Sequence, residues 1–178
     1  FFMKKNYTEE EIQSLAESTI GKSFKEIEKI FSKSKNYNIE EEPSSYVMEE
    51  EVQYDNRKQN KAYFGHAFET NVYNYDINST SAPDFEEAGI ELKVTPNKNN
   101  TLSAKERLVL NIINYMDEYK HTFFTSHFWY KNNKIQIVWY LYEPNKSKED
   151  LKITHEKLFT FPEEDLKIVI DDWNTIIK

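Results

Sequence analysis

The sequence predicts an α/β (α+β) protein in which a mixed central β-sheet is flanked by helices. Amphipathic helical patterns, with apolar side chains at helical spacing, open and close the chain. The strand-like apolar runs lie together between them instead of alternating regularly with helices, which is typical of a mixed sheet. The length of 178 residues suits a single domain with a sizeable core, and we find no linker that would separate two units.

Two short helices open the chain. Thr8 and Glu11 form a capping box in front of an amphipathic run, and Gly21 ends that run. Ser23 and Glu26 form a second capping box, which opens another amphipathic run. These signals predict a helical hairpin over residues 7–34, and taken alone the hairpin indicates an ordinary packing unit.

A polar, acidic segment and a third helix follow. Residues 35–60 contain few aliphatic side chains, so we expect a long surface loop or insertion. A helix is expected over residues 61–73, where Lys61, Gly65 and Glu69 share one face at intervals of four. Glycine costs a helix about 1 kcal/mol relative to alanine, so a close approach by another backbone or a ligand is a reasonable motive for Gly65. The alternative is a surface lysine and glutamate that flank a packing glycine.

Four strand-like runs and a last helix complete the pattern. The runs cover residues 88–95, 106–114, 134–142 and about 151–161. Residues 162–178 begin with a proline, carry acids in the first turn and place apolar side chains at helical spacing. We therefore expect residues 61–178 to form the core of the domain.

Composition limits the function. The absence of cysteine excludes a disulfide framework, a cysteine-ligated zinc and a cysteine nucleophile. No apolar run reaches the roughly 18 to 20 residues of a membrane span, and no signal peptide is visible, so we expect a cytoplasmic protein without a membrane partner.

Charge at first argues against a nucleic-acid partner. The formal charge is 23 − 31 = −8, and phosphate binding needs cations. However, residues 92–134 contain seven Lys or Arg, among them Lys98, Lys105 and Arg107, against three acids, which gives a local charge of 7 − 3 = +4. A basic face on an acidic body can still bind a polyanion.

The stretch APDFEEAGIELKVTP, residues 82–96, has the most informative pattern. Residues two apart in a strand face the same way, so Glu91 and Lys93 share one face. Gly89 allows a turn that brings Asp84 beside Glu91. The alternative is an ordinary Glu–Lys pair on a solvent-facing strand.

Neighbouring carboxylates suggest a metal site. Asp84 and Glu91 would repel each other unless a cation lay between them, and Mg²⁺ prefers such oxygen ligands. Glu69 can add a third carboxylate. Lys93 would then orient or help deprotonate an attacking water, or stabilise negative charge on phosphorus.

The four histidines show no metal-binding spacing. They are His66, His121, His127 and His155. His121 and His127 are six positions apart, which is the wrong interval for one helical face. We therefore interpret all four as structural or surface residues.

The central stretch resembles a known nuclease family. Asp84 after a proline, with Glu91 and Lys93, matches the PD-(D/E)xK nuclease signature. Residues 84–96 are similar to the catalytic stretch shared by MutH, the mismatch-repair nicking enzyme, and the Sau-type restriction endonucleases that cut GATC. Residues 103–115 resemble the restriction branch more closely, specifically its catalytic N-terminal domain.

The resemblance covers most of the chain. Residues 8–31 are similar to the N-terminal helical hairpin of the family, and the face with Lys61 and Glu69 falls on its K-x-x-x-G-x-x-x-E helix. Residues 125–131 match a T-S-H segment that ends in a second active-site lysine. The resemblance thus implies a restriction-endonuclease-like fold, with Mg²⁺ as cofactor. The implied site consists of metal-binding Glu69, Asp84 and Glu91 and catalytic Lys93 and Lys131, and the expected DNA contacts are Lys61, Lys98, Lys105 and Arg107.

The expected function is a Mg²⁺-dependent endonuclease that hydrolyses double-stranded DNA at GATC as the catalytic domain of a type II restriction enzyme, with its catalytic core in residues 61–178. One alternative is a MutH-like nicking enzyme whose activity is controlled by a repair partner. Another is a DNA-binding or regulatory module without chemistry, against which the intact set of Asp84, Glu91 and Lys93 argues.

Two departures from the family pattern affect the expected partners. The acidic insertion around residues 40–51 has no counterpart that we can place. Relatives also continue beyond the last helix, and that continuation carries much of the surface that recognises the DNA sequence. We therefore expect this domain to belong to a longer chain, with a C-terminal region or a second MutH-like domain for specificity, and with dimerisation on DNA as an option.

Overall fold

The computed structural model describes residues 6–33, 56–75, 81–98 and 103–177, apart from the side chains of residues 32–33 and 56–61. Within these ranges the elements are α1 (Glu9–Glu17), α2 (Phe24–Lys33), α3 (Asn56–Val72), β1 (Glu91–Asn97), α4 (Tyr115–Glu118), η1 (Phe123–Thr125), α5 (His127–Asn132), β2 (Lys134–Leu141), η2 (Lys148–Asp150), β3 (Ile153–Thr160) and α6 (Glu163–Ile177). None of the helices described here has the length and apolar character needed to cross a membrane.

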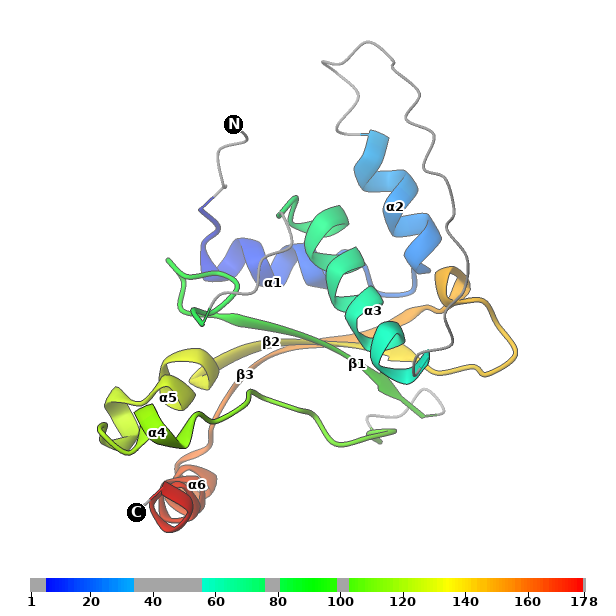
Figure 1. The fold of residues 1–178 in the computed structure, drawn as a ribbon. Coiled ribbons are helices and arrows are strands. Elements are labelled where there is room, and N and C mark those ends of the chain that lie inside the picture. Colours follow the sequence, from blue (N-terminus) through cyan, green and yellow to red (C-terminus); the bar gives the residue numbers. More distant parts are fainter. Residues whose placement is uncertain (1–5, 34–55, 76–80, 99–102, 178) are drawn as a thin grey trace.

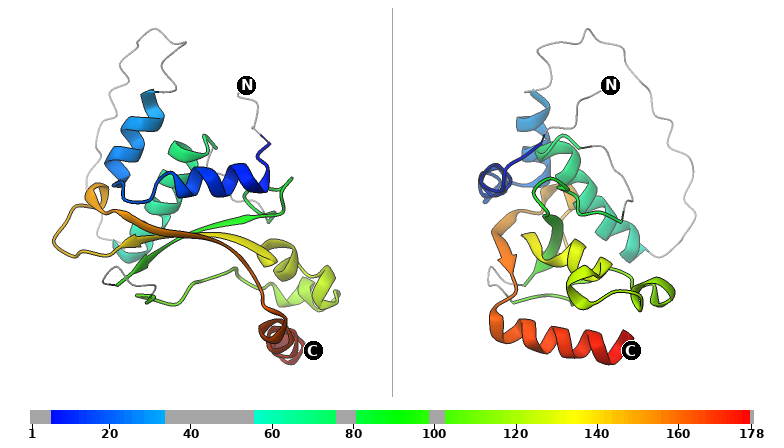
Figure 2. Two further views of the ribbon diagram at one scale, coloured as in Figure 1. Left: turned by 180° about the vertical axis from the view of Figure 1, so that it is seen from behind. Right: turned by 90° about the vertical axis from the view of Figure 1, so that its left-hand side faces the viewer.

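The expected mixed sheet flanked by helices is confirmed. β1 pairs with β2 in parallel, with Glu91 opposite Ile135, and β2 pairs with β3 in antiparallel orientation. α1, α2 and α3 cover one face of this sheet, whereas α6 lies on the opposite side (Figures 1 and 2). α4 and α5 lie together at one end of the sheet, where β2 begins (Figure 1).

Both predicted capping boxes form at the start of the hairpin helices. The Glu11 backbone N–H donates to Thr8 Oγ1 over 3.3 Å, and the Thr8 N–H donates to Glu11 Oε2 over 3.0 Å. Glu26 and Ser23 repeat this exchange at 3.2 and 2.7 Å. Each box satisfies N–H groups that the helix itself leaves unpaired, which is why α1 and α2 begin where the sequence indicates.

Aromatic side chains join the helical layer to the sheet. The ring of Phe64 in α3 lies 4.2 Å from that of Tyr140 in β2, and Tyr73 lies 4.7 Å from Phe85, both measured between centroids. All four are buried. This packing fixes α3 across β1, and with it the helical face that carries Glu69.

The strand expected at residues 106–114 is wrong. These residues form neither helix nor strand, and the described residue Ala104, just before them, meets β1 through an isolated bridge to Asn97. Val109 and Ile112 are 66% and 94% exposed, so the apolar alternation of this segment has no buried face to pair with. The segment instead runs in extended form toward α4, tied to α5 by a hydrogen bond from Asn132 Nδ2 to Asn111 Oδ1 (2.9 Å) (Figure 1).

Other boundaries differ by a few residues. α3 begins at Asn56 instead of residue 61. β1 begins at Glu91 instead of residue 88, because the chain first makes a turn that contains Gly89. Most of the acidic segment expected at residues 35–60 lies outside the described residues.

Candidate active site

A tight turn brings Asp84 to the start of β1. Phe85 and Ile90 pair across this turn, with N–H to carbonyl distances of 2.9 and 3.2 Å. Gly89 has a φ of +64°, a conformation that side chains with a Cβ rarely adopt. The result is a hydrogen bond of 2.9 Å from the Leu92 backbone N–H to Asp84 Oδ2, so the carboxylate lies against the strand that carries Glu91.

Glu91 lies between the two expected lysines. Its Oε1 accepts a hydrogen bond from Lys93 Nζ at 2.7 Å, and its Oε2 lies 3.7 Å from Lys131 Nζ. The Glu91 side chain is only 3% exposed. Oε2 is buried and accepts no hydrogen bond from any group that the structure describes. A buried carboxylate oxygen of this kind needs a cation or a further donor.

Glu69 faces the same group of charges from α3. Burial raises the pKa of its carboxyl to about 7, and the charges of Asp84 and Glu91 act in the same direction. The charges of Lys93 and Lys131 lower it but do not compensate. The five expected site residues therefore interact electrostatically across α3, the Asp84 turn, β1 and α5.

The same balance holds for Glu91. Burial is the largest cause that raises the pKa of its carboxyl, and the Asp84 charge raises it further. Lys93 and Lys131 lower this pKa, but the net pKa remains raised. Two lysines thus fall short of neutralising three converging carboxylates. The three residues expected to bind metal are thus coupled electrostatically.

This donor set fits a hard divalent cation. All the candidate ligand atoms are carboxylate oxygens, which Mg²⁺ prefers, and the orphaned Oε2 of Glu91 supplies a buried acceptor. Burial and then carboxylate repulsion raise the pKa values of Glu69 and Glu91, and a cation would offset both effects.

Gly65 lies in α3 one turn before Glu69. A Cβ at this position would meet Glu69 Oε1 at 3.8 Å, an ordinary van der Waals distance. Among the described atoms, no other backbone approaches Gly65 closely, and the approach of a ligand stays a prediction.

A cavity of about 660 Å³ opens beside the lysines. It is lined by Ser81, Lys93, Leu110, Asn111, Ile112, Asn114, Asp117, Glu118, His127 and Lys131. The extended segment that sequence reasoning assigned to a strand thus forms one wall of the cavity. Lys93 and Lys131 reach the cavity from two different elements, β1 and α5.

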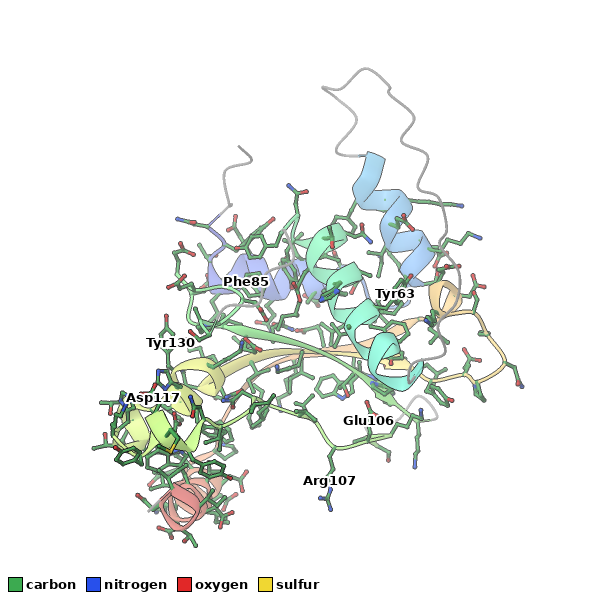
Figure 3. All side chains as sticks on the ribbon, in the orientation of Figure 1. Tyr63, Phe85, Glu106, Arg107, Asp117 and Tyr130 are labelled. Atoms are coloured by element: carbon green, nitrogen blue, oxygen red, sulfur yellow. The ribbon has the colours of Figure 1, made fainter. Side chains whose placement is uncertain are left out.

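The residues expected to bind DNA lie elsewhere. Lys98 and Lys105 are held near the far end of β1, where Lys98 N–H donates to the Ser103 carbonyl and Lys105 Nζ lies 3.2 Å from the centroid of the Tyr142 ring. A seven-residue strand of this kind separates them from Glu91 by roughly 20 Å. Arg107 points away from the body of the protein (Figure 3). The side chain of Lys61 lies outside the described residues.

His121 and His127 lie close together although they are six positions apart in the sequence, and their interpretation as structural or surface residues stays a prediction. One ligand atom from each, and one from Asp117, lie within 4.8 Å of one another. The spacing argument assumed one continuous helix, but η1 reverses the chain between the two histidines. Ser126 caps α5 by accepting a hydrogen bond from the Trp129 N–H (3.0 Å), and this N-cap signal could have revealed the break.

Comparison with known proteins points to one family. A family model described as "DNA mismatch repair enzyme MutH" matches residues 73–172, more than half of the chain. The type II restriction enzyme Sau3AI of Staphylococcus aureus is 41% identical over 124 residues, which cover 67% of this chain. The chain spans about a quarter (25%) of the length of that relative.

Proposed function

This chain belongs to the MutH family. On this basis we propose that it hydrolyses DNA phosphodiester bonds as the catalytic domain of a type II restriction endonuclease. The observation that carries the proposal is the buried Oε2 of Glu91, which has no hydrogen-bond partner among the described groups and lies among two lysines and two further carboxylates. Lys93 and Lys131 lie within the matched range, and Glu69 lies just outside it. The electrostatic coupling of Glu69 to Asp84 and Glu91 therefore supports Glu69 independently of the family match.

In this proposal Glu69, Asp84 and Glu91 hold Mg²⁺. When bound, the ion supplies charge that polarises the scissile phosphate and lowers the pKa of nearby water. The Leu92 N–H holds Asp84 Oδ2 in place, which leaves its other oxygen for the cation. Mg²⁺ itself is inferred from the oxygen donors, which also suit Mn²⁺.

The two lysines act on the phosphate and the attacking water. Glu91 Oε1 fixes Lys93 Nζ at 2.7 Å, so the ammonium group stays at the site instead of extending into solvent. From there it orients the water or stabilises the negative charge that develops on phosphorus. Lys131 approaches from α5 and adds positive charge on the cavity side.

The restriction branch is favoured over a repair nickase by the 41% identity to an enzyme whose name states restriction activity. Double-stranded DNA with GATC sites is the substrate that we propose, on the resemblance of residues 84–96 to enzymes that cut this sequence. Because the match covers only 25% of the relative's length, we also propose that regions beyond this domain, or a second copy, complete sequence recognition. Such an enzyme would act on DNA in the cytoplasm.

We further propose that residues 61–178 are the catalytic core and residues 7–34 its supporting hairpin. Lys61, Lys98, Lys105 and Arg107 would contact the DNA backbone away from the cleaved bond. The position of Lys98 and Lys105 near the far end of β1 supports this role, since phosphate contacts spread over roughly 20 Å fit the length of a short duplex site.

The test is digestion of a supercoiled plasmid with mapped GATC sites, in Mg²⁺ and in EDTA. We expect Mg²⁺-dependent cutting at GATC, weak for this domain and stronger for a protein that includes the regions matching the rest of the relative. Linear product indicates a restriction enzyme, and nicked circles indicate the repair-type alternative. DNA binding without cutting, by both proteins and with Mg²⁺ or Mn²⁺, would support the non-catalytic module and refute the proposal.

A further inference from the structure

A second cluster of ligand-type side chains lies beside the cavity, and two of its three members line it. Asp117 belongs to α4, His121 follows that helix, and His127 is the first residue of α5. One ligand atom from each lies within 4.8 Å of the others. Figure 3 shows Asp117 among the side chains of α4 and α5, at the end of the sheet.

A buried carboxylate orients His127. Glu118, 3% exposed, accepts a hydrogen bond at Oε2 from the His127 backbone N–H (3.2 Å) and pairs there with Nδ1 of the ring (3.1 Å). With Nδ1 as the donor, Nε2 carries the lone pair, and it lies 3.8 Å from Asp117 Oδ2. Histidines that bind metal through one nitrogen commonly donate the other to a carboxylate in this way.

Glu118 is itself held rigidly. Its Oε1 accepts hydrogen bonds from the Phe128 N–H at 3.1 Å and from Trp173 Nε1 at 3.2 Å. These contacts come from α5 and α6, so the orientation of His127 depends on how the two helices pack. The ring of a surface histidine without such hydrogen bonds would adopt many orientations.

The remaining two ligands need only a small adjustment. The ring centroids of His121 and His127 are 5.0 Å apart. Ligand atoms around a tetrahedral ion with bonds of about 2.0 Å lie about 3.3 Å apart. The side chain of Asp117 is 45% exposed and that of His121 is partly exposed, so both can rotate toward His127.

We propose that Asp117, His121 and His127 bind one borderline divalent ion of the Zn²⁺ class, with Glu118 as a positioning residue. Two imidazoles and one carboxylate suit Zn²⁺, Co²⁺ or Ni²⁺, whereas Mg²⁺ prefers oxygen ligands. The site is therefore chemically distinct from the all-carboxylate group at Glu91.

The site remains open toward the active-site cavity. Asp117 and His127 line the cavity that also contains Lys93 and Lys131. Three protein ligands leave at least one coordination position for water or for an anionic oxygen that enters the cavity.

The experiment uses tag-free protein, treated with a chelator and then titrated with Co²⁺ and Zn²⁺ in millimolar Mg²⁺. We expect one equivalent of Co²⁺ to give the visible absorption of a tetrahedral site, and calorimetry to give one Zn²⁺ bound. His121→Ala should abolish the absorption and weaken Zn²⁺ at least about 100-fold, and Asp117→Asn should weaken it less. Glu118→Gln should weaken it about 10- to 100-fold.

Two control variants distinguish metal binding at this cluster from metal binding elsewhere in the protein. His66→Gln removes a histidine outside the cluster, and Asp84→Asn alters the carboxylate site, so neither should change Co²⁺ or Zn²⁺ binding. His121→Cys should restore binding with a sulfur-shifted spectrum, which a loss caused by misfolding would not allow.

Three results would overturn the proposal. The first is Zn²⁺ affinity in His121→Ala equal to that of the unaltered protein. The second is loss of the Co²⁺ absorption in Asp84→Asn. The third is the absence of stoichiometric Zn²⁺ binding to a folded, unaltered protein. None of these outcomes depends on whether the protein cleaves DNA.

Discussion

Lys93 Nζ lies 2.7 Å from Glu91 Oε1, although only Leu92 separates the two residues in β1. The contact arises because side chains two apart in a strand lie on one side of the sheet. The two oxygens of Glu91 therefore differ: Oε1 accepts a hydrogen bond from Lys93, whereas Oε2 is buried and has no hydrogen-bond partner among the described groups. A simple solvent-facing Glu–Lys pair would leave both residues far more exposed than 3% and 19%.

The first prediction concerns the carboxylates. Asp84→Asn keeps an oxygen to accept the Leu92 N–H but removes the charge, so the turn should survive. Cleavage in Mg²⁺ should fall at least about 100-fold for this variant and for Glu91→Gln, while the melting temperature changes little. Plasmid digestion and thermal unfolding measure the two effects.

Glu86→Gln is the matched control for these variants. Glu86 is an exposed acid in the same turn, so its loss of charge should leave cleavage unchanged. Normal cleavage by Asp84→Asn would show that the charge of this carboxylate is dispensable and would remove it from the proposed site.

Local sequence patterns predicted much of the carboxylate cluster. Strand alternation predicted the shared face of Glu91 and Lys93, and Gly89 predicted the turn that returns Asp84 to the strand. The helical spacing that ends at Glu69 predicted a third carboxylate, and the coulombic coupling to Asp84 and Glu91 agrees with its expected position. These inferences succeed because each depends on geometry within a few residues.

Contacts between residues far apart in the chain were harder to predict from the sequence. Lys131 was expected only through the resemblance, since nothing within α5 shows that its side chain approaches Glu91. The strand expected at residues 106–114 failed because alternation describes a half-buried face but does not supply a partner strand. The closeness of His121 and His127 was not predicted for a related reason, since the reversal of the chain at η1 depends on tertiary packing.

The second prediction separates catalysis from binding. Lys131→Ala and Lys93→Ala should slow the single-turnover rate in Mg²⁺ far more than they weaken DNA binding in Ca²⁺, because both lysines act on charge that develops during the reaction. Lys120→Ala removes a lysine of the same local basic region, 56% exposed and paired with Asp117, and should leave the rate unchanged. Equal losses of rate and binding for Lys93→Ala would indicate ordinary phosphate recognition.

The third prediction concerns Glu118, which joins α4, α5 and α6. Burial alone would raise the pKa of this carboxyl, but hydrogen bonds from the Phe128 N–H, Trp173 and His127 outweigh burial and lower it. Glu118→Ala leaves these donors without an acceptor, so it should lower the free energy of unfolding by about 2 to 4 kcal/mol. Urea denaturation measures the change.

Glu163→Ala is the control for Glu118. It removes an acid of α6 that is 88% exposed and only loosely paired with Lys167, so stability should change little. If Glu118→Ala unfolded at the same urea concentration as this control, the network around Glu118 would not hold the three helices together.

The last prediction concerns pH. The carboxyl of Glu69 has a pKa near 4.5 in an unfolded chain and about 7 in the folded protein, so the folded state retains its proton over that interval. The stability that this group contributes is complete below pH 4.5 and is lost as the pH rises through 7. With partial exposure discounted, we expect a loss on the order of 1 to 2 kcal/mol in metal-free protein.

Glu69→Gln provides the test, because glutamine resembles the protonated acid at every pH. In EDTA, the variant should be more stable than the unaltered protein at about pH 8, and this advantage should disappear near pH 4.5. Mg²⁺ at the higher pH should stabilise the unaltered protein, since the cation offsets the ionised carboxylates, and should stabilise the variant less because one ligand has lost its charge. Urea denaturation at both pH values, with and without Mg²⁺, measures these differences. Stability profiles that run parallel for the two proteins across this pH range would show that Glu69 ionises without a penalty, and hence that it lies outside the repelling cluster of Asp84 and Glu91.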